Sequence, residues 1–292
     1  MGMTTREPCE KVAWTCCRVL SLKNLPPNFD IMSSQFSIIR SGESMVFRKN
    51  PYAYFEFRKS VSEDYRYVHS DEVRRFLDDV SVTAGRRLVE LEEGSELWRA
   101  QIGFDTEEVL IEDTGTTVGQ EVPFNEQRMI PRLRKQIAGR VNPGNINCVY
   151  LAREKDTAVA EVRPWLGARV SVAKFTANKN LKIVDCLRNE VPRVWVPLGK
   201  PPENCEFYVW SQINDAFAMP VDPRDESKAY VPTQVLAELF RRDGYDGISY
   251  TSSLRPGGLN IALFDMSAVQ VVSRQLCTVN GVKYEFDCDS PR

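Results

Sequence analysis

A set of polar residues interrupts otherwise apolar stretches between positions 99 and 260. It comprises Arg99, Arg140, Tyr150, Glu161, Ser252, Ser253 and Asn260. Burying several charged groups is costly unless they pair with one another or serve a site. Arginines, a carboxylate, a tyrosine and hydroxyls near strand ends suit an anionic substrate that contains a sugar, because guanidinium groups form paired hydrogen bonds with phosphates.

Each of these residues also has a purely structural interpretation. Glu161, in "AVAEV", fits the exposed side of an amphipathic helix, and Ser252 and Ser253, in "YTSS", fit the cap of a turn. Taken singly, each structural interpretation is favoured. The combination is what indicates a site.

Other kinds of chemistry lack their motifs. No GxGxxG follows an expected strand and no GxxxxGK[ST] is present, which argues against Rossmann dinucleotide binding and P-loop chemistry. His69 is the single histidine, so a two-histidine zinc motif is excluded, and the spacing of Cys9, Cys16 and Cys17 matches no common zinc pattern. We therefore expect no metal. A formal net charge of −2 gives no basic excess for nucleic acid or an anionic membrane.

Two helices are expected from capping signals and apolar periodicity. In residues 70–85, Ser70 caps a stretch with one apolar face, and Gly85 ends it. In residues 231–247, Pro232 suits the first turn and Gly244 the end. A shorter helix is expected in residues 156–165, with Asp156 or Thr157 as its cap and Pro164 near its end.

Alternating or continuous apolar runs predict strands. We expect them at residues 95–103, 148–152, 169–175, 180–186, 247–253 and 259–265, with a strand or two in 47–61 and a hairpin about the Asn-Gly pair within 277–286. Residues 105–127 are expected to form an insertion or mobile loop, and the proline-rich residues 188–230 predict no element. Strands separated by a few helices favour an α+β fold with a mixed, mostly antiparallel sheet and flanking helices.

The ordered set "LWRAQIG", "GRVNPG…VYLA", "TAVAEVRP", "VPTQVLAELFRRDGYDGISYTSS" and "LNIALF", across residues 97–266, resembles the RES-domain family. Its members are typically toxins of bacterial toxin–antitoxin pairs. Their fold is similar to that of ADP-ribosyltransferases, and they attack NAD. The resemblance implies that NAD is a substrate and that no metal is needed.

The resemblance also assigns roles. Arg140, with Arg99, would bind the pyrophosphate, and Tyr150 would lie against the nicotinamide. Glu161 would stabilise the charge that develops on the ribose. Ser252, with Ser253 as its rival, would orient the ribose or the nicotinamide amide, and Asn260 would join them in binding NAD.

We expect an N-terminal extension at residues 1–88 and the RES domain at 89–292. The main hypothesis is an NAD glycohydrolase or phosphorylase. The alternatives are a mono-ADP-ribosyltransferase that modifies a host protein, and a non-catalytic module that binds NAD or a partner. The expected partners are NAD, an antitoxin protein and further copies in a homo-oligomer. The chain lacks a signal-peptide pattern and an apolar run that could span a bilayer, so we expect a cytoplasmic location and no membrane binding.

Overall fold

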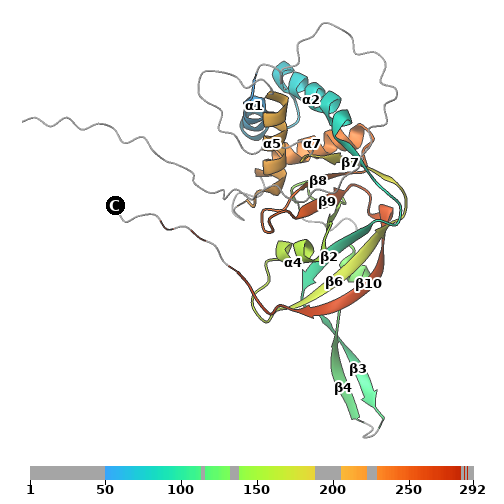
Figure 1. Cartoon of the computed structure of the whole chain (residues 1–292). Helices are drawn as coiled ribbons and strands as arrows, with labels where there is room; N and C mark the ends of the chain where they lie inside the picture. The colour runs from blue at the N-terminus through green and yellow to red at the C-terminus, as the bar shows by residue number, and fades with distance from the viewer. Residues whose placement is uncertain are drawn as a thin grey trace, which may run out of the picture. The chain divides into compact units, whose positions relative to one another are not determined.

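The computed structural model describes residues 50–112, 116–131, 138–187, 205–221 and 229–283, together with Phe286 and Cys288. Figure 1 shows helices gathered beside one part of a sheet, and a two-stranded hairpin that leaves another part of it. Within the described ranges, no helix is both long and apolar enough to cross a membrane.

One eight-stranded sheet forms the centre of the fold. Its strands, in their order across the sheet, are β1 (Leu88–Leu91), β7 (Leu181–Asp185), β8 (Gly247–Thr251), β9 (Leu259–Leu263), β5 (Val149–Ala152), β2 (Glu96–Ile102), β6 (Arg169–Ala177) and β10 (Val269–Thr278). Strands β7 and β8 run parallel, whereas every other neighbouring pair of this sheet is antiparallel. The predicted α+β fold with a mostly antiparallel sheet is confirmed.

The sheet has a seam between β5 and β2. These two strands pair at one position only, Trp98 opposite Ala152, whereas β5 pairs with β9 and β2 pairs with β6 along most of their lengths. Beyond that pair the strands separate. We call the line between β5 and β2 the seam.

Helices cover one face of the β7–β8–β9 part of the sheet (Figure 1). They are α1 (Ala53–Lys59), the π-helix η2 (Ser60–Asp64), α2 (Asp71–Ala84), the 3-10 helix η3 (Gly85–Arg87), α5 (Cys205–Ala218) and α7 (Val231–Arg242). Side chains of α1, α2, α5 and α7 share one apolar core with Ile248 and Tyr250 of β8. Residues 53–84 therefore pack into the same core as the later helices.

The opposite face and the other end of the sheet have their own apolar clusters. Leu97, Val149, Phe175 and Leu263 bury one side together with Phe124 and Met129, beside the short helix α3 (Glu126–Met129). The 3-10 helix η4 (Met266–Ala268) leads into β10. Helix α4 (Lys155–Glu161) packs through Ala158 onto Ala100, Ala152 and Val170.

Most elements expected from clear end signals are confirmed. Ser70 is the N-cap of α2, and its hydroxyl accepts a hydrogen bond from the Val73 amide at 3.4 Å. Pro232 lies in the first turn of α7, and Gly244, with φ of +86°, follows its end. Strands β2, β5, β6, β7, β8 and β9 lie where apolar alternation predicted them.

Two predictions about individual elements were wrong. Residues 53–59 form helix α1 rather than a strand: its buried residues Ala53, Tyr54 and Phe57, followed by Val61, have helical spacing within an aromatic alternation. The cap of α4 is Glu154, one residue before the helix, instead of Asp156 or Thr157. After β10, residues 279–283 belong to no strand, and residues 284 and 285 of the expected hairpin about Asn280 lie outside the described residues.

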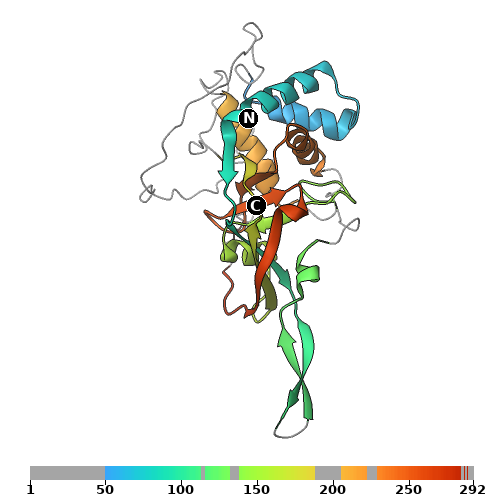
Figure 2. The same ribbon diagram turned by 90° about the vertical axis from the view of Figure 1, so that its right-hand side faces the viewer.

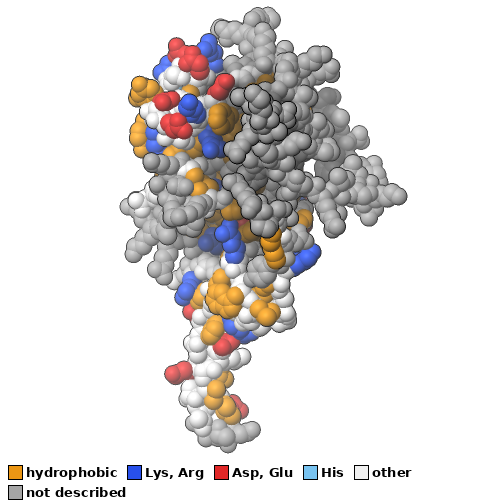
Figure 3. Space-filling view, turned by 90° about the vertical axis from the view of Figure 1, so that its left-hand side faces the viewer, with side chains coloured by type: hydrophobic (Ala, Val, Ile, Leu, Met, Phe, Trp, Pro, Cys, Tyr) orange, Lys and Arg blue, Asp and Glu red, His pale blue; other side chains and the backbone are white. Residues whose placement is uncertain are grey.

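The expected mobile loop at residues 105–127 is instead largely a two-stranded hairpin. Strands β3 (Asp105–Ile111) and β4 (Thr116–Val122) pair antiparallel with Val109 opposite Val118, because valines, isoleucine and threonines favour extended backbone. Both views of the ribbon show the hairpin running away from the main sheet (Figures 1 and 2). The space-filling view shows apolar and acidic side chains on the hairpin among uncharged ones, and Val109, Leu110, Ile111 and Val118 are exposed (Figure 3).

Helix α5 lies inside the proline-rich stretch from which no element was expected. Residues 205–218 contain no proline, and Val209, Trp210, Ile213 and Phe217 of this helix are buried with helical spacing. The remaining parts of that stretch at 188–204 and 222–228 lie outside the described residues.

Candidate functional site

A cavity of about 330 Å³ lies at the seam. Residues 98–100 of β2 and 150–152 of β5 line it, so it extends from the Trp98–Ala152 pair to positions where the two strands are no longer paired. Further walls come from the end of α4, the segment at 138–140, Tyr230 before α7, Tyr250 of β8 and Asn260 of β9. Separation of paired strands thus makes room in the sheet for a ligand.

Glu161 places its carboxylate in this cavity. The residue is the last of α4, because Arg163, at φ of +48°, precedes Pro164 and turns the chain out of the helix. Ser252 Oγ and Asn260 Nδ2 each donate a hydrogen bond of 2.7 Å to the same oxygen, Oε1. Among the described residues nothing bonds to Oε2, so this oxygen can meet a ligand.

Ser252 and Ser253 differ sharply in their surroundings. Ser252 is buried, and its oxygen accepts hydrogen bonds from the Leu254 and Arg255 amides at 3.2 Å while its hydroxyl donates to Glu161. Ser253 is exposed and does not line the cavity. Of the two serines considered from the sequence, Ser252 is the one that contacts Glu161.

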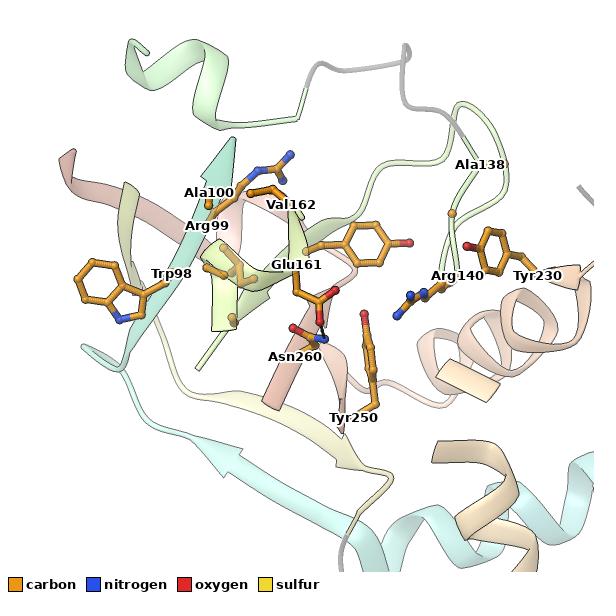
Figure 4. Close-up of a pocket in the computed structure, with 15 residues that line it drawn as sticks. Trp98, Arg99, Ala100, Ala138, Arg140, Glu161, Val162, Tyr230, Tyr250 and Asn260 are labelled. Carbon is orange, nitrogen blue, oxygen red and sulfur yellow. Dashed lines mark hydrogen bonds between the residues drawn. The ribbon is translucent and has the colours of Figure 1, made fainter. Parts of the chain in front are cut away.

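Arg140 lies across the cavity from Glu161 (Figure 4). Its Nη1 donates a 2.9 Å hydrogen bond to the Phe217 carbonyl. Burial lowers the pKa of Arg140, but the neighbouring Tyr250, Tyr230 and Glu161 raise it, and the net change is upward. Arg140 therefore stays a cation at every physiological pH.

Tyr150 of β5 lines the cavity, and its hydroxyl contacts the segment that carries Arg140. The hydroxyl accepts a hydrogen bond from the Val141 amide at 2.9 Å and donates one to Asn142 Oδ1 at 2.8 Å. Burial raises its pKa well above the usual value. A Cβ on Gly139 would come within 2.6 Å of this hydroxyl, so the close approach requires glycine.

Arg99 also belongs to the lining, from β2. Its Nε and Nη1 atoms are buried and have no hydrogen-bond partner among the described residues. Burial lowers the pKa of its guanidinium, although Cys148 and Tyr150 oppose that change. An anionic ligand in the cavity would supply hydrogen-bond acceptors for these two nitrogens.

The structure therefore brings most of the predicted site residues together. Arg99, Arg140, Tyr150, Glu161 and Asn260 line one cavity, and Ser252 bonds to Glu161 behind it. Sequence reasoning missed Tyr230 and Tyr250, which flank Arg140. Both are tyrosines in apolar stretches, as Tyr150 is, so the same signal was present at their positions.

A second cavity of about 340 Å³ lies between α1 and α2, and none of the predicted site residues lines it. Since the two cavities have similar volumes, the presence of the predicted site residues rather than size identifies the one at the seam as the candidate site. In the described part of the chain, no group of three or more His, Cys, Asp and Glu side chains could hold a metal ion.

The match to a protein-family model agrees with the sequence pattern. A model of the RES domain family matches residues 120–287. Among solved structures, the chain is similar to one from the crystal structure of the M. tuberculosis MbcT–MbcA toxin–antitoxin complex, at 12% identity, over 69% of this chain and 94% of that chain, with a TM-score of 0.38. A comparison with curated protein sequences finds no match. Because the family model spans more than half of its residues, the chain belongs to the RES domain family.

Proposed function

We propose that this protein binds NAD in the cavity at the seam and cleaves the bond between nicotinamide and ribose. The observation that supports this most is the Glu161 carboxylate, which two hydrogen bonds hold in a cavity that also contains two arginines. A fixed negative charge beside cationic groups suits a substrate that has both a pyrophosphate and a ribose at which positive charge develops.

The reaction needs little from the protein except placement of charge. Nicotinamide in NAD carries a positive charge on its ring nitrogen, and it leaves with the electron pair of the bond to ribose C1′. The ribose then becomes an oxocarbenium ion, which the Glu161 carboxylate stabilises through its Oε2 oxygen. An acceptor attacks C1′ and releases a proton, which completes the reaction.

The other residues of the site divide between the two charged parts of NAD. The pyrophosphate would accept hydrogen bonds from the unpartnered nitrogens of Arg99, and the Arg140 cation would attract its negative charge. The ring of Tyr150 offers an aromatic face to the cationic nicotinamide. Ser252 and Asn260 hold Glu161 in place, and this is the role that their hydrogen bonds support best.

The size of the cavity agrees with this division. Sites for small molecules are usually about 300–1,000 Å³ in volume. The cavity, at about 330 Å³, is at the lower end of that range, so we expect it to enclose the nicotinamide and its ribose while the adenosine half lies outside.

We further propose that the protein acts in the cytoplasm as the toxin of a toxin–antitoxin pair, which follows from its family. Consumption of NAD would harm the cell that produces this protein, so the toxin requires a protein antitoxin. We expect the antitoxin to cover the cavity or to hold the protein in an inactive homo-oligomer.

The test is to incubate purified protein with NAD and to measure free nicotinamide, with and without phosphate and with cellular proteins present. ADP-ribose as the second product identifies water as the acceptor, ADP-ribose 1″-phosphate identifies phosphate, and a mass increase of a protein identifies transfer. If the wild-type protein releases no nicotinamide under any of these conditions, the proposal fails.

A further inference from the structure

The segment that carries Arg140 is held by side chains from two other elements. From α7, Gln234 Nε2 donates hydrogen bonds to the Gly139 carbonyl at 2.8 Å and to the Asn142 carbonyl at 3.2 Å. From β5, the Tyr150 hydroxyl bonds to the Val141 amide and to the Asn142 side chain. These contacts tie the backbone on both sides of Arg140.

The amide of Gln234 makes these contacts in one orientation only. Arg66 donates a 3.1 Å hydrogen bond to its Oε1, so the amide nitrogen must face the two carbonyls. Gln234 and Asn142 are both buried, at 4% and 1% exposure, so water cannot readily replace a lost bond. Arg66 precedes the part of the chain that the family model matches, and it reaches the site segment through Gln234.

Gln234 lies in the first turn of α7, close to a residue that lines the cavity. Tyr230, the N-cap of α7, lines the cavity beside Arg140, and its carbonyl accepts a hydrogen bond of 2.9 Å from the Gln234 backbone amide. The start of α7 therefore both flanks Arg140 and fixes the segment on which it stands. At the far side, the Phe217 carbonyl of α5 accepts a bond from the Arg140 guanidinium.

We infer that Gln234 is a positioning residue, which acts on the reaction by holding Arg140 at the wall of the cavity. This inference rests on the proposed cleavage of NAD. Gln234 does not line the cavity, so it acts on the site through the segment to which it bonds, the segment that carries Arg140. A guanidinium held in place before the substrate arrives binds the pyrophosphate without a further loss of conformational freedom.

The test compares Gln234→Met with Gln212→Met. Methionine keeps the length of the side chain but has no N–H donor. Gln212 of α5 is a matched control, because its Nε2 donates a 2.8 Å hydrogen bond to the Pro51 carbonyl, away from the cavity. We expect Gln234→Met to lower kcat/KM for NAD by about tenfold or more, mainly through KM. Gln212→Met should stay within about twofold of wild type, in line with a loss outside the site.

A double variant separates positioning from general damage to the fold. If Gln234 acts through Arg140, then Gln234→Met should cause no further loss of kcat/KM in a protein that already carries Arg140→Ala. Three results would each overturn the inference. The first is a double variant whose loss of kcat/KM is the product of the two single losses. The others are a wild-type kcat/KM for Gln234→Met and an equal loss for Gln212→Met.

Amide hydrogen exchange provides a second measurement that does not depend on activity. Gln234→Met should speed exchange at the Gly139 and Val141 amides, which bond to the Asn142 carbonyl and to Tyr150, whereas Gln212→Met should leave it unchanged. Unchanged exchange in Gln234→Met would refute the inference that Gln234 holds the segment that carries Arg140. Absence of nicotinamide release by the wild type would refute the proposed function instead, so the two failures are distinct.

Discussion

Replacing Glu161 by glutamine removes one negative charge from the site while leaving its shape nearly unchanged. The amide oxygen of glutamine can still accept the hydrogen bonds that Ser252 and Asn260 now donate to Oε1 at 2.7 Å. What disappears is the charge beside the ribose at the moment when that sugar becomes cationic. We therefore expect Glu161→Gln to bind NAD and to cleave it poorly.

The size of this loss follows from electrostatics. Two unit charges about 4 Å apart interact by about 4 kcal/mol at an effective dielectric constant of about 20. Because Glu161 is half-buried and partly screened by solvent, somewhat less is expected, which corresponds to a fall in kcat of about 10²–10³-fold. Stability should move little or upward, because Glu161 ends α4, where the helix dipole disfavours a negative charge by about 0.3–1 kcal/mol.

Nicotinamide release and the melting temperature, measured on the same preparations, check both expectations. Asp156→Asn is the control, since it removes a carboxylate from the other end of α4, where the side chain is exposed and pairs with Arg255. Its activity should stay within about twofold of wild type, as is usual for surface changes. Glu161→Gln with near wild-type kcat, or a loss of activity explained by unfolding, would refute the assigned role of Glu161.

Ser252→Ala should lower kcat by about tenfold or more, because Glu161 loses a donor, whereas Ser253→Ala should match wild type; equal effects in the nicotinamide assay would contradict this. Burial raises the pKa of Tyr150 and Tyr250 above that of the unfolded chain, about 10. The stability that these tyrosines contribute is thus fully present below pH 10 and is lost as pH rises beyond it. Melting temperature from pH 8 to pH 12 measures this, and a flat profile above pH 10 would refute it. Replacing residues 106–121 by an Asn-Gly turn should leave NAD cleavage within about twofold of wild type, since the hairpin lies outside the cavity; a large loss of activity with an unchanged melting temperature would show otherwise.

Helices and strands could be predicted where a local sequence signal, such as a cap or an apolar alternation, determines their position. Ser70 and Pro232 are such signals for α2 and α7, and apolar alternation is one for β2. The site residues could be grouped in advance because a family pattern orders them along the chain. Their meeting in one cavity depends on the order of strands β8, β9, β5 and β2, which no local signal specifies.

Other features depend on contacts between distant residues. Helix α1 is formed by an alternating aromatic run that indicates a strand. Packing of Phe57 on Phe76 of α2, with ring centroids 4.5 Å apart, overrides that local preference. Tyr150 could be predicted as a site residue, but not that its hydroxyl bonds to the backbone of the Arg140 segment. Gln234 reads as an ordinary residue of an amphipathic helix until its partners at positions 139 and 142 are known.

The seam has a consequence for stability as well as for binding. A single pair of residues joins β5 to β2, so the sheet consists of two parts that are weakly connected at the seam, and the cavity lies between them. A molecule that contacts both Arg99 of β2 and Tyr150 of β5 would link the two parts of the sheet a second time. Its binding energy adds to the energy that resists unfolding, by mass action. A ligand that fills the site therefore also raises the free energy of unfolding of the sheet.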